Sequence, residues 1–247
     1  MELHPAEQLA LAAAQARDRS LQTQAARKRS HGIVHTSPEL ARFVLRAVDE
    51  LLQDELQLAG GVGDARVHVV DPACGPGAFL AAALQVLADK PRVAATLTGI
   101  DVDAEALQLA AALEPFATQL GARLQLRCAD TLREPGLLPA SQVGRVLAIV
   151  GNPPWSVAAA EATEQMQQLL ETFRCDAAGV RLPEKKLGVL SDAYVRFFRW
   201  AAEAARSSSG GAVVGLVTNA SFLDGPVHRG MRAALLRWFD RLWVIDL

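Results

Sequence analysis

Apolar runs alternate with amphipathic stretches from Arg66 to the end of the chain, and their spacing predicts the secondary structure. Short apolar runs bounded by glycine or polar residues predict buried strands at 67–70, 97–100, 124–127, 146–150, 212–217 and 242–245. Stretches with apolar residues at helical spacing predict helices at 78–87, 104–113, 191–205 and 228–239. Because strands that alternate with helices form parallel sheets covered on both faces, the predicted fold class is α/β, with a doubly wound, mostly parallel sheet.

Two further helices are expected ahead of the first strand. Residues 5–29 are rich in Ala, Gln and Arg, and they predict a helical arm that packs on the main body or on a partner. Ser37 and Pro38 are typical of a helix start, with Ser as the N-cap and Pro at the first helical position. The arm carries a basic cluster, which is either a solvated helix face or a contact for phosphates. This cluster consists of Arg17, Arg19, Arg27, Lys28 and Arg29.

One segment, residues 156–187, does not fit the alternation. It contains an Ala/Glu/Gln-rich helical stretch and the basic pair Lys185 and Lys186. An insertion directly after a predicted strand lies over the edge of the sheet where ligands bind. The segment is therefore either a substrate-facing loop or a surface excursion.

The composition limits the class of protein. With 247 residues, 51% hydrophobic and 21% charged, the chain suits one α/β domain with a large core, with or without an appendage. Its net charge of −2 means that any surface for nucleic acid must be local. Cys74, Cys128 and Cys175 are far apart, so we expect reduced thiols in a cytoplasmic protein, without metal or disulfides. No apolar stretch is long enough to span a bilayer, and no secretory signal is expected.

The most informative motif is Asn152-Pro153-Pro154-Trp155, which follows the predicted strand at 146–150. This position places Asn152 at the rim of the sheet, where α/β proteins bind ligands. The two prolines lack N–H groups, so the turn offers carbonyl acceptors and few donors. Trp155 adds a flat stacking face. Acceptors beside an aromatic ring suit a planar ligand with an exocyclic amino group; the alternative is a Pro-rich turn with a core Trp.

A loop of small residues follows the first predicted strand. It begins with Asp71 and includes Ala73, Gly75 and Gly77, which let backbone N–H groups approach a ligand at a helix N-terminus. Leu80 stands where a dinucleotide-binding loop has its third glycine. Because a carboxylate repels a pyrophosphate and attracts a cation, Asp71 favours a sulfonium or ammonium cofactor over a dinucleotide.

Two more acids follow the next predicted strands. Asp101 can accept hydrogen bonds from a ribose diol, and Ile100 and Val102 beside it could pack on an adenine ring. Asp130 could accept a hydrogen bond from an adenine amino group. Each acid alone could equally be a turn residue or a helix cap. Three acidic strand ends in succession, including Asp71, together predict a pocket for S-adenosylmethionine.

With these motifs the chain resembles the amino-group DNA methyltransferases that act on adenine N6. The loop at 71–77, Asp101, Asp130 and the turn at 152–155 carry the resemblance. The segment 35–40 precedes the loop, which is the order of the γ class, and the resemblance implies that Thr36 helps to hold the methionine end of the cofactor. Three later segments look like single-chain restriction–modification enzymes of the type IIG and ISP kind: 192–201, 218–225 and 228–232.

The resemblance implies a domain organisation and partners. We expect a helical arm at 1–30 and a Rossmann-like, class I S-adenosylmethionine-dependent methyltransferase domain at 31–247. The family fold adds an antiparallel seventh strand and a target-recognition region, which we expect to lie outside this sequence. The expected partners are DNA with a flipped adenine, and a chain that supplies target recognition or nuclease activity; no membrane is involved.

The resemblance also assigns the catalytic turn. Trp155 stacks on the flipped base, while the Asn152 side-chain oxygen and the Pro153 carbonyl accept the two N6 hydrogens. Pro154 completes the turn, and Asn152 also borders the cofactor. The methyl group then transfers in line from sulfur, through positioning and electrostatics and without a metal.

Other functions stay open at this point. Methyltransferases of RNA bases or of protein glutamine present amines or amides to a similar turn, and N4 of cytosine fits the same acceptors. A truncated, non-catalytic domain that binds cofactor or a partner chain is a second alternative. A nicotinamide-dependent oxidoreductase is disfavoured by Asp71 and by the missing third glycine.

Overall fold

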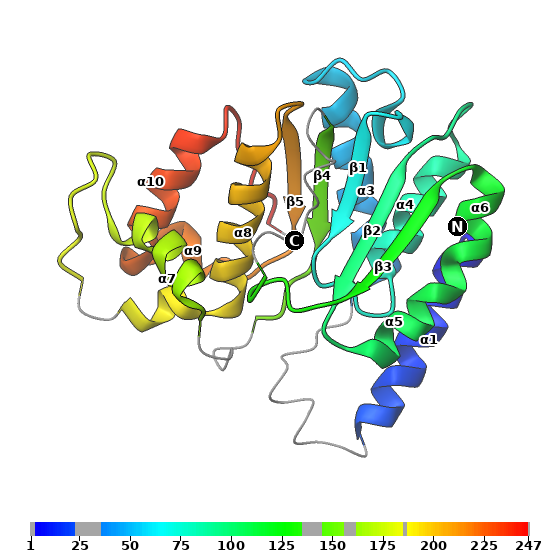
Figure 1. Ribbon diagram of the computed structural model, residues 1–247, viewed down its shortest axis with the longest axis horizontal. Coiled ribbons are helices and arrows are strands. Elements are labelled where there is room, and N and C mark those ends of the chain that lie inside the picture. The colour runs from blue at the N-terminus through cyan, green and yellow to red at the C-terminus, as the bar shows by residue number, and fades with distance from the viewer. Residues whose placement is uncertain (1–2, 23–35, 135–144, 156–161, 185–186, 247) are drawn as a thin grey trace.

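The computed structural model describes residues 3–22, 36–134, 145–155, 162–184 and 187–246. Within these residues, a five-stranded parallel sheet has the order β3-β2-β1-β4-β5 (Figure 1). The strands are β1 (Val67–Asp71), β2 (Thr96–Asp101), β3 (Arg123–Cys128), β4 (Val146–Gly151) and β5 (Ala212–Leu216). The sheet confirms the predicted α/β, doubly wound class and the first five predicted strands.

Helices from the first half of the chain cover one face of the sheet. They are α1 (Pro5–Gln22), α3 (Pro38–Asp54), α4 (Ala78–Ala88), α5 (Ala104–Ala110) and α6 (Glu114–Leu120). The start of α3 is the predicted one, because the Ser37 hydroxyl caps it by accepting a hydrogen bond from the Leu40 N–H at 3.3 Å. Leu45 and Leu52 of α3 are fully buried in one core with Leu80 of α4.

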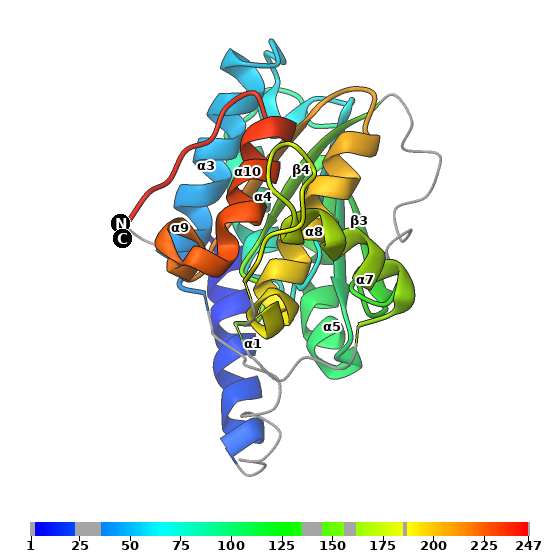
Figure 2. The same cartoon turned by 90° about the vertical axis from the view of Figure 1, so that its left-hand side faces the viewer.

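The second face is covered by α7 (Glu164–Glu171), α8 (Ala193–Ser207) and α10 (Arg229–Trp238), which Figure 2 shows together on one side of the molecule. Tyr194 and Trp200 of α8 are buried in a second core with Ile149 of β4. Shorter elements connect these layers: α9 (Ser221–Asp224) and the 3₁₀ turns η1 (Gly61–Gly63), η2 (Ala111–Leu113), η4 (Thr172–Arg174), η5 (Leu187–Ser191) and η6 (Pro226–His228).

The described part of the insertion, 162–184, is divided: residues 177–181 are exposed on the surface, whereas residues 164–174 pack into the protein. Met166, Leu170 and Phe173 of this segment are almost completely buried in the second core. The segment packs so tightly on α10 that a β-carbon at Gly230 would lie 2.2 Å from the Phe173 carbonyl oxygen. Burial of this apolar surface makes the insertion part of the layer that covers β4 and β5. Lys185 and Lys186 lie outside the described residues.

Ion pairs of two arginines, Arg42 and Arg17, bind the N-terminal helix to the main body. The Arg42 guanidinium of α3 donates two hydrogen bonds of 3.0 Å to the carboxylate of Glu7, and both side chains are buried. Arg17 pairs with Asp103 and Glu105 at the start of α5. Arg17 therefore serves the structure through its ion pairs. It belongs neither to a solvated helix face nor to a contact for phosphates. The side chain of Arg19 and residues 27–29 lie outside the part of the chain that the structure describes.

The predicted sixth strand is wrong. Residues 239–246 contain no strand, and Figure 2 shows this C-terminal segment as an extended chain that runs on from α10. The side chains of Trp243 and Val244 are 56% and 61% exposed. An apolar run becomes a strand only where a neighbour satisfies its backbone, and within the described residues β5 pairs with β4 alone.

Candidate active site

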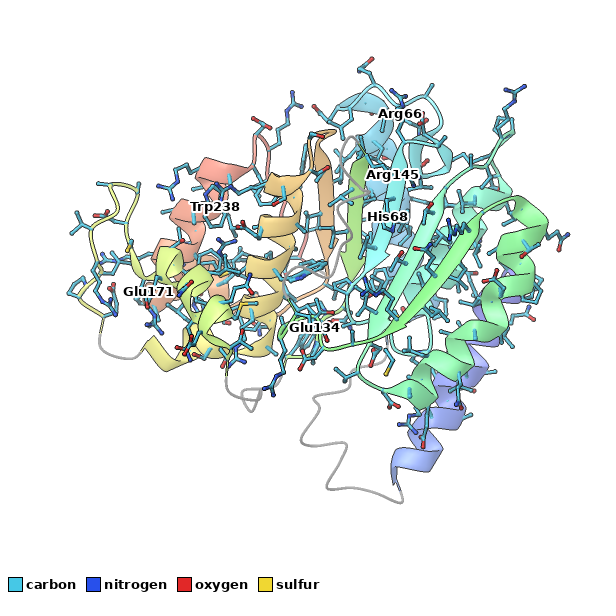
Figure 3. The ribbon with its side chains drawn as sticks, in the orientation of Figure 1. Arg66, His68, Glu134, Arg145, Glu171 and Trp238 are labelled. Carbon is cyan, nitrogen blue, oxygen red and sulfur yellow. The ribbon has the colours of Figure 1, made fainter. Side chains whose placement is uncertain are left out.

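The candidate site lies where all five parallel strands end. Figure 3 shows Glu134, which follows β3, at this carboxyl edge, and Arg66 and Arg145, which precede β1 and β4, toward the opposite edge. The chain runs from β1 outward to β2 and β3, and then returns to place β4 on the other side of β1. The strand order thus reverses between β1 and β4, and such a reversal opens a crevice for ligands at the carboxyl ends.

Asp71 ends β1 at this reversal and is 1% exposed. Its Oδ1 accepts a hydrogen bond of 3.1 Å from the Ala73 N–H. Burial raises the pKa of the Asp71 carboxyl to about 8; the Ala73 N–H lowers this pKa in part, and the negative charge of Asp101 raises it further. The carboxyl also borders the end of β4, because a β-carbon at Gly151 would lie 2.9 Å from Asp71 Oδ1.

The loop after Asp71 is held open by its glycines. Gly75 and Gly77 have φ of +51° and +96°, in the left-handed region that suits glycine. A β-carbon at Gly75 would meet nothing within 4 Å, whereas one at Gly77 would lie 2.9 Å from the Leu113 side chain. Open space at Gly75 leaves room for a ligand to approach the backbone, and Gly77 is the N-cap of α4.

Asp101 binds the same loop from β2. Its Oδ2 accepts a hydrogen bond of 2.7 Å from the Gly75 N–H, and its Oδ1 accepts one of 2.8 Å from the Asp103 N–H. Burial raises the pKa of the Asp101 carboxyl, while these N–H donors lower it. Of the two apolar residues beside it, Val102 is 55% exposed, whereas Ile100 is fully buried in the second core. Ile100 therefore cannot contact an adenine ring, and that expectation is wrong.

The turn after β3 joins the same edge. Asp130 Oδ1 accepts a hydrogen bond of 3.0 Å from the Leu132 N–H, which uses part of its capacity as an acceptor. The buried Thr131 hydroxyl donates a hydrogen bond of 2.7 Å to the Pro72 carbonyl. Through this bond the turn after β3 is fixed against the loop after β1.

Asn152 follows β4, and the nitrogen and oxygen of its side-chain amide have different surroundings. Its Nδ2 donates a hydrogen bond of 3.1 Å to the Thr36 hydroxyl. Its Oδ1 is buried and has no hydrogen-bond partner in the described part of the chain. A buried carbonyl oxygen without a donor costs free energy, and this cost is avoided when a ligand N–H occupies the site.

The rest of the turn divides into a buried and an open part. Pro153 is buried, Pro154 is half-buried, and Trp155 is 37% exposed. Trp155 is thus not a core residue, as it would be in the alternative of a Pro-rich turn with a core Trp. Its ring remains accessible for stacking.

Three residues near the site were missed by sequence reasoning. Thr131 fixes the loop after β1, and Thr218 has a buried hydroxyl without a hydrogen-bond partner in the described residues. Thr218 follows Val217, whose N–H donates to the Gly151 carbonyl at 2.9 Å, so it lies at the end of β5 beside the Asn152 turn.

Arg196 of α8 is buried. Burial lowers the pKa of its guanidinium, while the charges of Asp130 and Asp192 oppose this effect. Position after a strand end could have identified Thr131 and Thr218; the sequence carries no signal for Arg196.

These contacts join the loop after β1, the turn after β3 and the Asn152 turn at one edge of the sheet. Asp101 contacts Gly75, Thr131 contacts Pro72, Asp71 contacts Gly151, and Thr36 contacts Asn152, as described above. The cysteines Cys74, Cys128 and Cys175 are free, and no group of His, Cys, Asp or Glu with the arrangement of a metal site occurs among the described residues. Nor is any helix in those residues both long and apolar enough to cross a membrane.

A family model described as N-6 DNA methylase matches residues 20–214 of the chain. No curated protein matches the chain. Among solved structures, the DNA-bound ATP-dependent type ISP restriction–modification enzyme LlaBIII is similar, with a TM-score of 0.63 at 21% identity over 83% of this chain and 16% of that one. The DrdV–DNA complex has a TM-score of 0.63 at 23% identity, over 85% of this chain and 22% of that one.

A third similar structure is the methyltransferase subunit of a type I restriction–modification system from Streptococcus thermophilus. Its TM-score is 0.52 at 17% identity, over 83% of this chain and 38% of that one. At these identities the likeness concerns the fold. The chain spans less than a quarter of LlaBIII and of the DrdV chain.

Proposed function

This chain belongs to the N-6 DNA methylase family, and on that premise we propose that it transfers a methyl group from S-adenosylmethionine to the N6 amino group of adenine in DNA. The activity is that of an adenine-specific, site-specific DNA methyltransferase. We assign it to the modification part of a restriction–modification system, because the structures to which it is similar are restriction–modification proteins by name.

One observation carries this proposal: the Oδ1 of Asn152 at the carboxyl end of β4 is buried and has no hydrogen-bond partner within the described ranges. The amide nitrogen is already engaged with Thr36, so the free acceptor faces a ligand that donates. The following residue, Pro153, has a carbonyl and no N–H. Two neighbouring acceptors match the two hydrogens of an exocyclic amine.

The residues on the other side of the strand reversal fit the cofactor. When bound, S-adenosylmethionine supplies a methyl group on a positively charged sulfur. At neutral pH the Asp71 carboxyl, with a pKa of about 8, is largely protonated in the ligand-free protein. A cation nearby would lower this pKa and be stabilised by the resulting carboxylate. Ala73, Gly75 and Gly77 would line the methionine end of the site, which has open space over Gly75.

The nucleoside end of the cofactor would lie over β2 and β3. Asp101 accepts two backbone hydrogen bonds and, as a carboxylate, keeps lone pairs for a ribose diol. The exposed side chain of Val102 would pack on the adenine ring. Asp130 would accept from the adenine amino group with the oxygen that the Leu132 N–H leaves free.

The target adenine would enter from the β4 and β5 side. An adenine within a duplex is out of reach of a recessed turn, so the base must be flipped out of the helix. Trp155, one third exposed, would stack on it and recover part of the lost stacking energy. Asn152 Oδ1 and the Pro153 carbonyl would then accept the N6 hydrogens and turn the nitrogen lone pair toward the methyl group.

These acceptors also stabilise the transition state. Positive charge develops on N6 as the new carbon–nitrogen bond forms, and two carbonyl dipoles in a water-poor site favour that charge. The extra proton on N6 passes to solvent after transfer. The chain's own contribution is therefore positioning and electrostatics.

The proposed partners follow from the reaction. DNA is the substrate, and a further protein region or chain supplies target recognition and cleavage. Because its substrate is the cell's DNA, we place the protein in the cytoplasm. The arm at 1–30 and the domain at 31–247 remain the proposed organisation.

The proposed function is tested by nucleoside analysis. Purified protein is incubated with methyl-labelled S-adenosylmethionine and unmethylated genomic DNA, which contains short target sequences of many kinds. We expect label in N6-methyladenine after enzymatic digestion of the DNA. Parallel reactions with RNA and with total protein serve as controls.

The result would contradict the proposal if label appeared only in RNA or protein, or only in N4-methylcytosine. Cofactor binding without transfer to any of the substrates would instead support a non-catalytic domain. Each outcome selects one of the alternatives that the sequence leaves open.

A further inference from the structure

We propose that Thr36 is a positioning residue for the catalytic amide, which it holds so that Oδ1 of Asn152, and not Nδ2, faces the substrate amine. This inference rests on the proposed function, because it gives Thr36 a role in the methyl-transfer step. The resemblance alone assigns Thr36 to the methionine end of the cofactor, whereas the hydrogen bond connects it to Asn152.

The contact joins two rigid parts of the fold. Thr36 and Asn152 are 116 positions apart in sequence, and the Asn152 Nδ2 lies 3.1 Å from the Thr36 hydroxyl oxygen. Thr36 directly precedes Ser37, the N-cap of α3, and α3 is anchored by fully buried leucines. Asn152 directly follows β4, whose residues are all buried. The start of α3 and the end of β4 thus hold the hydroxyl and the amide next to each other.

An amide needs such a partner because its two ends are nearly equal in size. Rotation by half a turn about the terminal torsion exchanges the oxygen and the nitrogen at little steric cost. In the wrong orientation two N–H donors would face the hydrogens of the substrate amine. Correct orientation of Asn152 must therefore come from hydrogen bonding.

The observed partners select one orientation. Nδ2 has an acceptor in the Thr36 hydroxyl, and Oδ1 is buried with no donor among the residues that the structure describes. The free protein thus keeps an unsatisfied carbonyl oxygen directed away from Thr36. The cost of that unsatisfied oxygen is recovered only when a donor binds, so the amide is preorganised for an amine ligand.

The experiment compares three variants with wild type. Thr36→Val removes the hydroxyl and keeps the shape, Thr36→Ser restores the hydroxyl, and Thr118→Val makes the same change at an exposed position of α6. Neither change at 36 touches the Ser37 cap of α3. Thermal unfolding of each variant verifies that it folds.

Three readouts distinguish the roles. The single-turnover rate of methyl transfer to DNA reports on the reaction, and calorimetric titration with S-adenosylmethionine reports on the cofactor site. The ¹⁵N side-chain amide signal of Asn152, assigned by its loss in Asn152→Ala, reports on the hydrogen bond without need for activity.

We expect Thr36→Val to lower the single-turnover rate about tenfold, the usual equivalent of one hydrogen bond, with cofactor affinity unchanged. The Asn152 amide protons should move upfield and exchange faster in this variant. Thr36→Ser should recover most of the rate and the signal, and Thr118→Val should match wild type.

A loss of cofactor affinity as large as the loss of rate would overturn the proposal and return Thr36 to the cofactor site. An amide signal that is identical in Thr36→Val and wild type would also overturn it. A wild-type protein without transfer activity would instead refute the proposed function, and the amide signal would still decide whether Thr36 orients Asn152.

Discussion

Gly151 and Asp71 pack so closely that a β-carbon at residue 151 would lie 2.9 Å from the Asp71 carboxylate oxygen. Gly151 precedes Asn152, the proposed catalytic residue, and Asp71 begins the loop of the proposed cofactor site. The contact therefore sets the spacing between the two halves of the proposed site, across the reversal of strand order between β1 and β4. Both residues are buried, so neither can move toward solvent to make room.

Substitution of Gly151 by Ala should disturb both halves together. The added methyl group must displace the Asp71 carboxyl, and we expect the free energy of unfolding to fall by about 1–3 kcal/mol, the usual cost of overpacking. Affinity for S-adenosylmethionine should fall as well, as measured by calorimetry. Gly188→Ala is the matched control, since a β-carbon there meets nothing within 4 Å. Unchanged stability and affinity in Gly151→Ala would show that the Asp71 side chain is free to rearrange.

Replacement of Asn152 by Ala should separate binding from chemistry. Loss of the amide oxygen removes one transition-state acceptor, so the transfer rate should fall about 100-fold or more. Cofactor affinity should stay close to wild type, because the loop at 71–77 and Asp101 are untouched. Single-turnover kinetics and calorimetry measure the two quantities. An equal loss of both would argue that Asn152 mainly supports the cofactor.

The raised pKa of Asp71 predicts how stability depends on pH. The carboxyl has a pKa of about 8 in the folded protein, against 3.8 for an ordinary Asp carboxyl, so the folded state binds the proton more tightly. This contribution to stability is present below about pH 4 and is lost as pH rises toward 8. The variant Asp71→Asn has no titrating carboxyl at this position. The free energy of unfolding of wild type should therefore fall relative to that of Asp71→Asn between pH 5 and 8, as followed by urea unfolding. Parallel curves would refute burial of a neutral Asp71 carboxyl.

The buried ion pair between α1 and α3 should be essential for stability. Arg42→Met leaves the Glu7 carboxylate, which is 2% exposed, without its guanidinium, and we expect a loss of about 3–5 kcal/mol. The pair of Arg66 and Asp64 offers a control, because the Arg66 side chain is 61% exposed and Arg66→Met should change stability far less than Arg42→Met.

A second variant excludes a general effect of Met at position 42. Adding Glu7→Gln to Arg42→Met removes the unpaired charge, and it should recover part of the lost stability. If Arg42→Met alone were as stable as Arg66→Met, the N-terminal helix would contribute little to the fold.

Several parts of the molecule were predictable because they depend on local pattern. The first five strands follow from apolar runs, and the start of α3 follows from Ser37 and Pro38. The meeting of Asp71, Asp101 and Asn152 at one edge follows from topology, because parallel strands end on the same side.

Other features depended on neighbours that a local pattern does not reveal. The run at 242–245 has the composition of a strand but no partner strand among the described residues. Arg17 has the composition of a surface cluster but pairs with two acids of α5. Ile100 stands beside Asp101 in sequence but faces the core, since successive strand residues point to opposite faces.

The order of apolar and polar residues by itself determined the α/β class and the edge at which the site lies. The motif residues at 71–77 and 152–155 indicated the family to which the chain is similar. Only the tertiary structure decided that the Asn152 amide is held by Thr36, that Asp71 is buried against Gly151, and that the insertion builds a core. The reason is physical: strand pattern acts over neighbouring residues, whereas hydrogen bonds and burial depend on which distant segments meet when the chain folds.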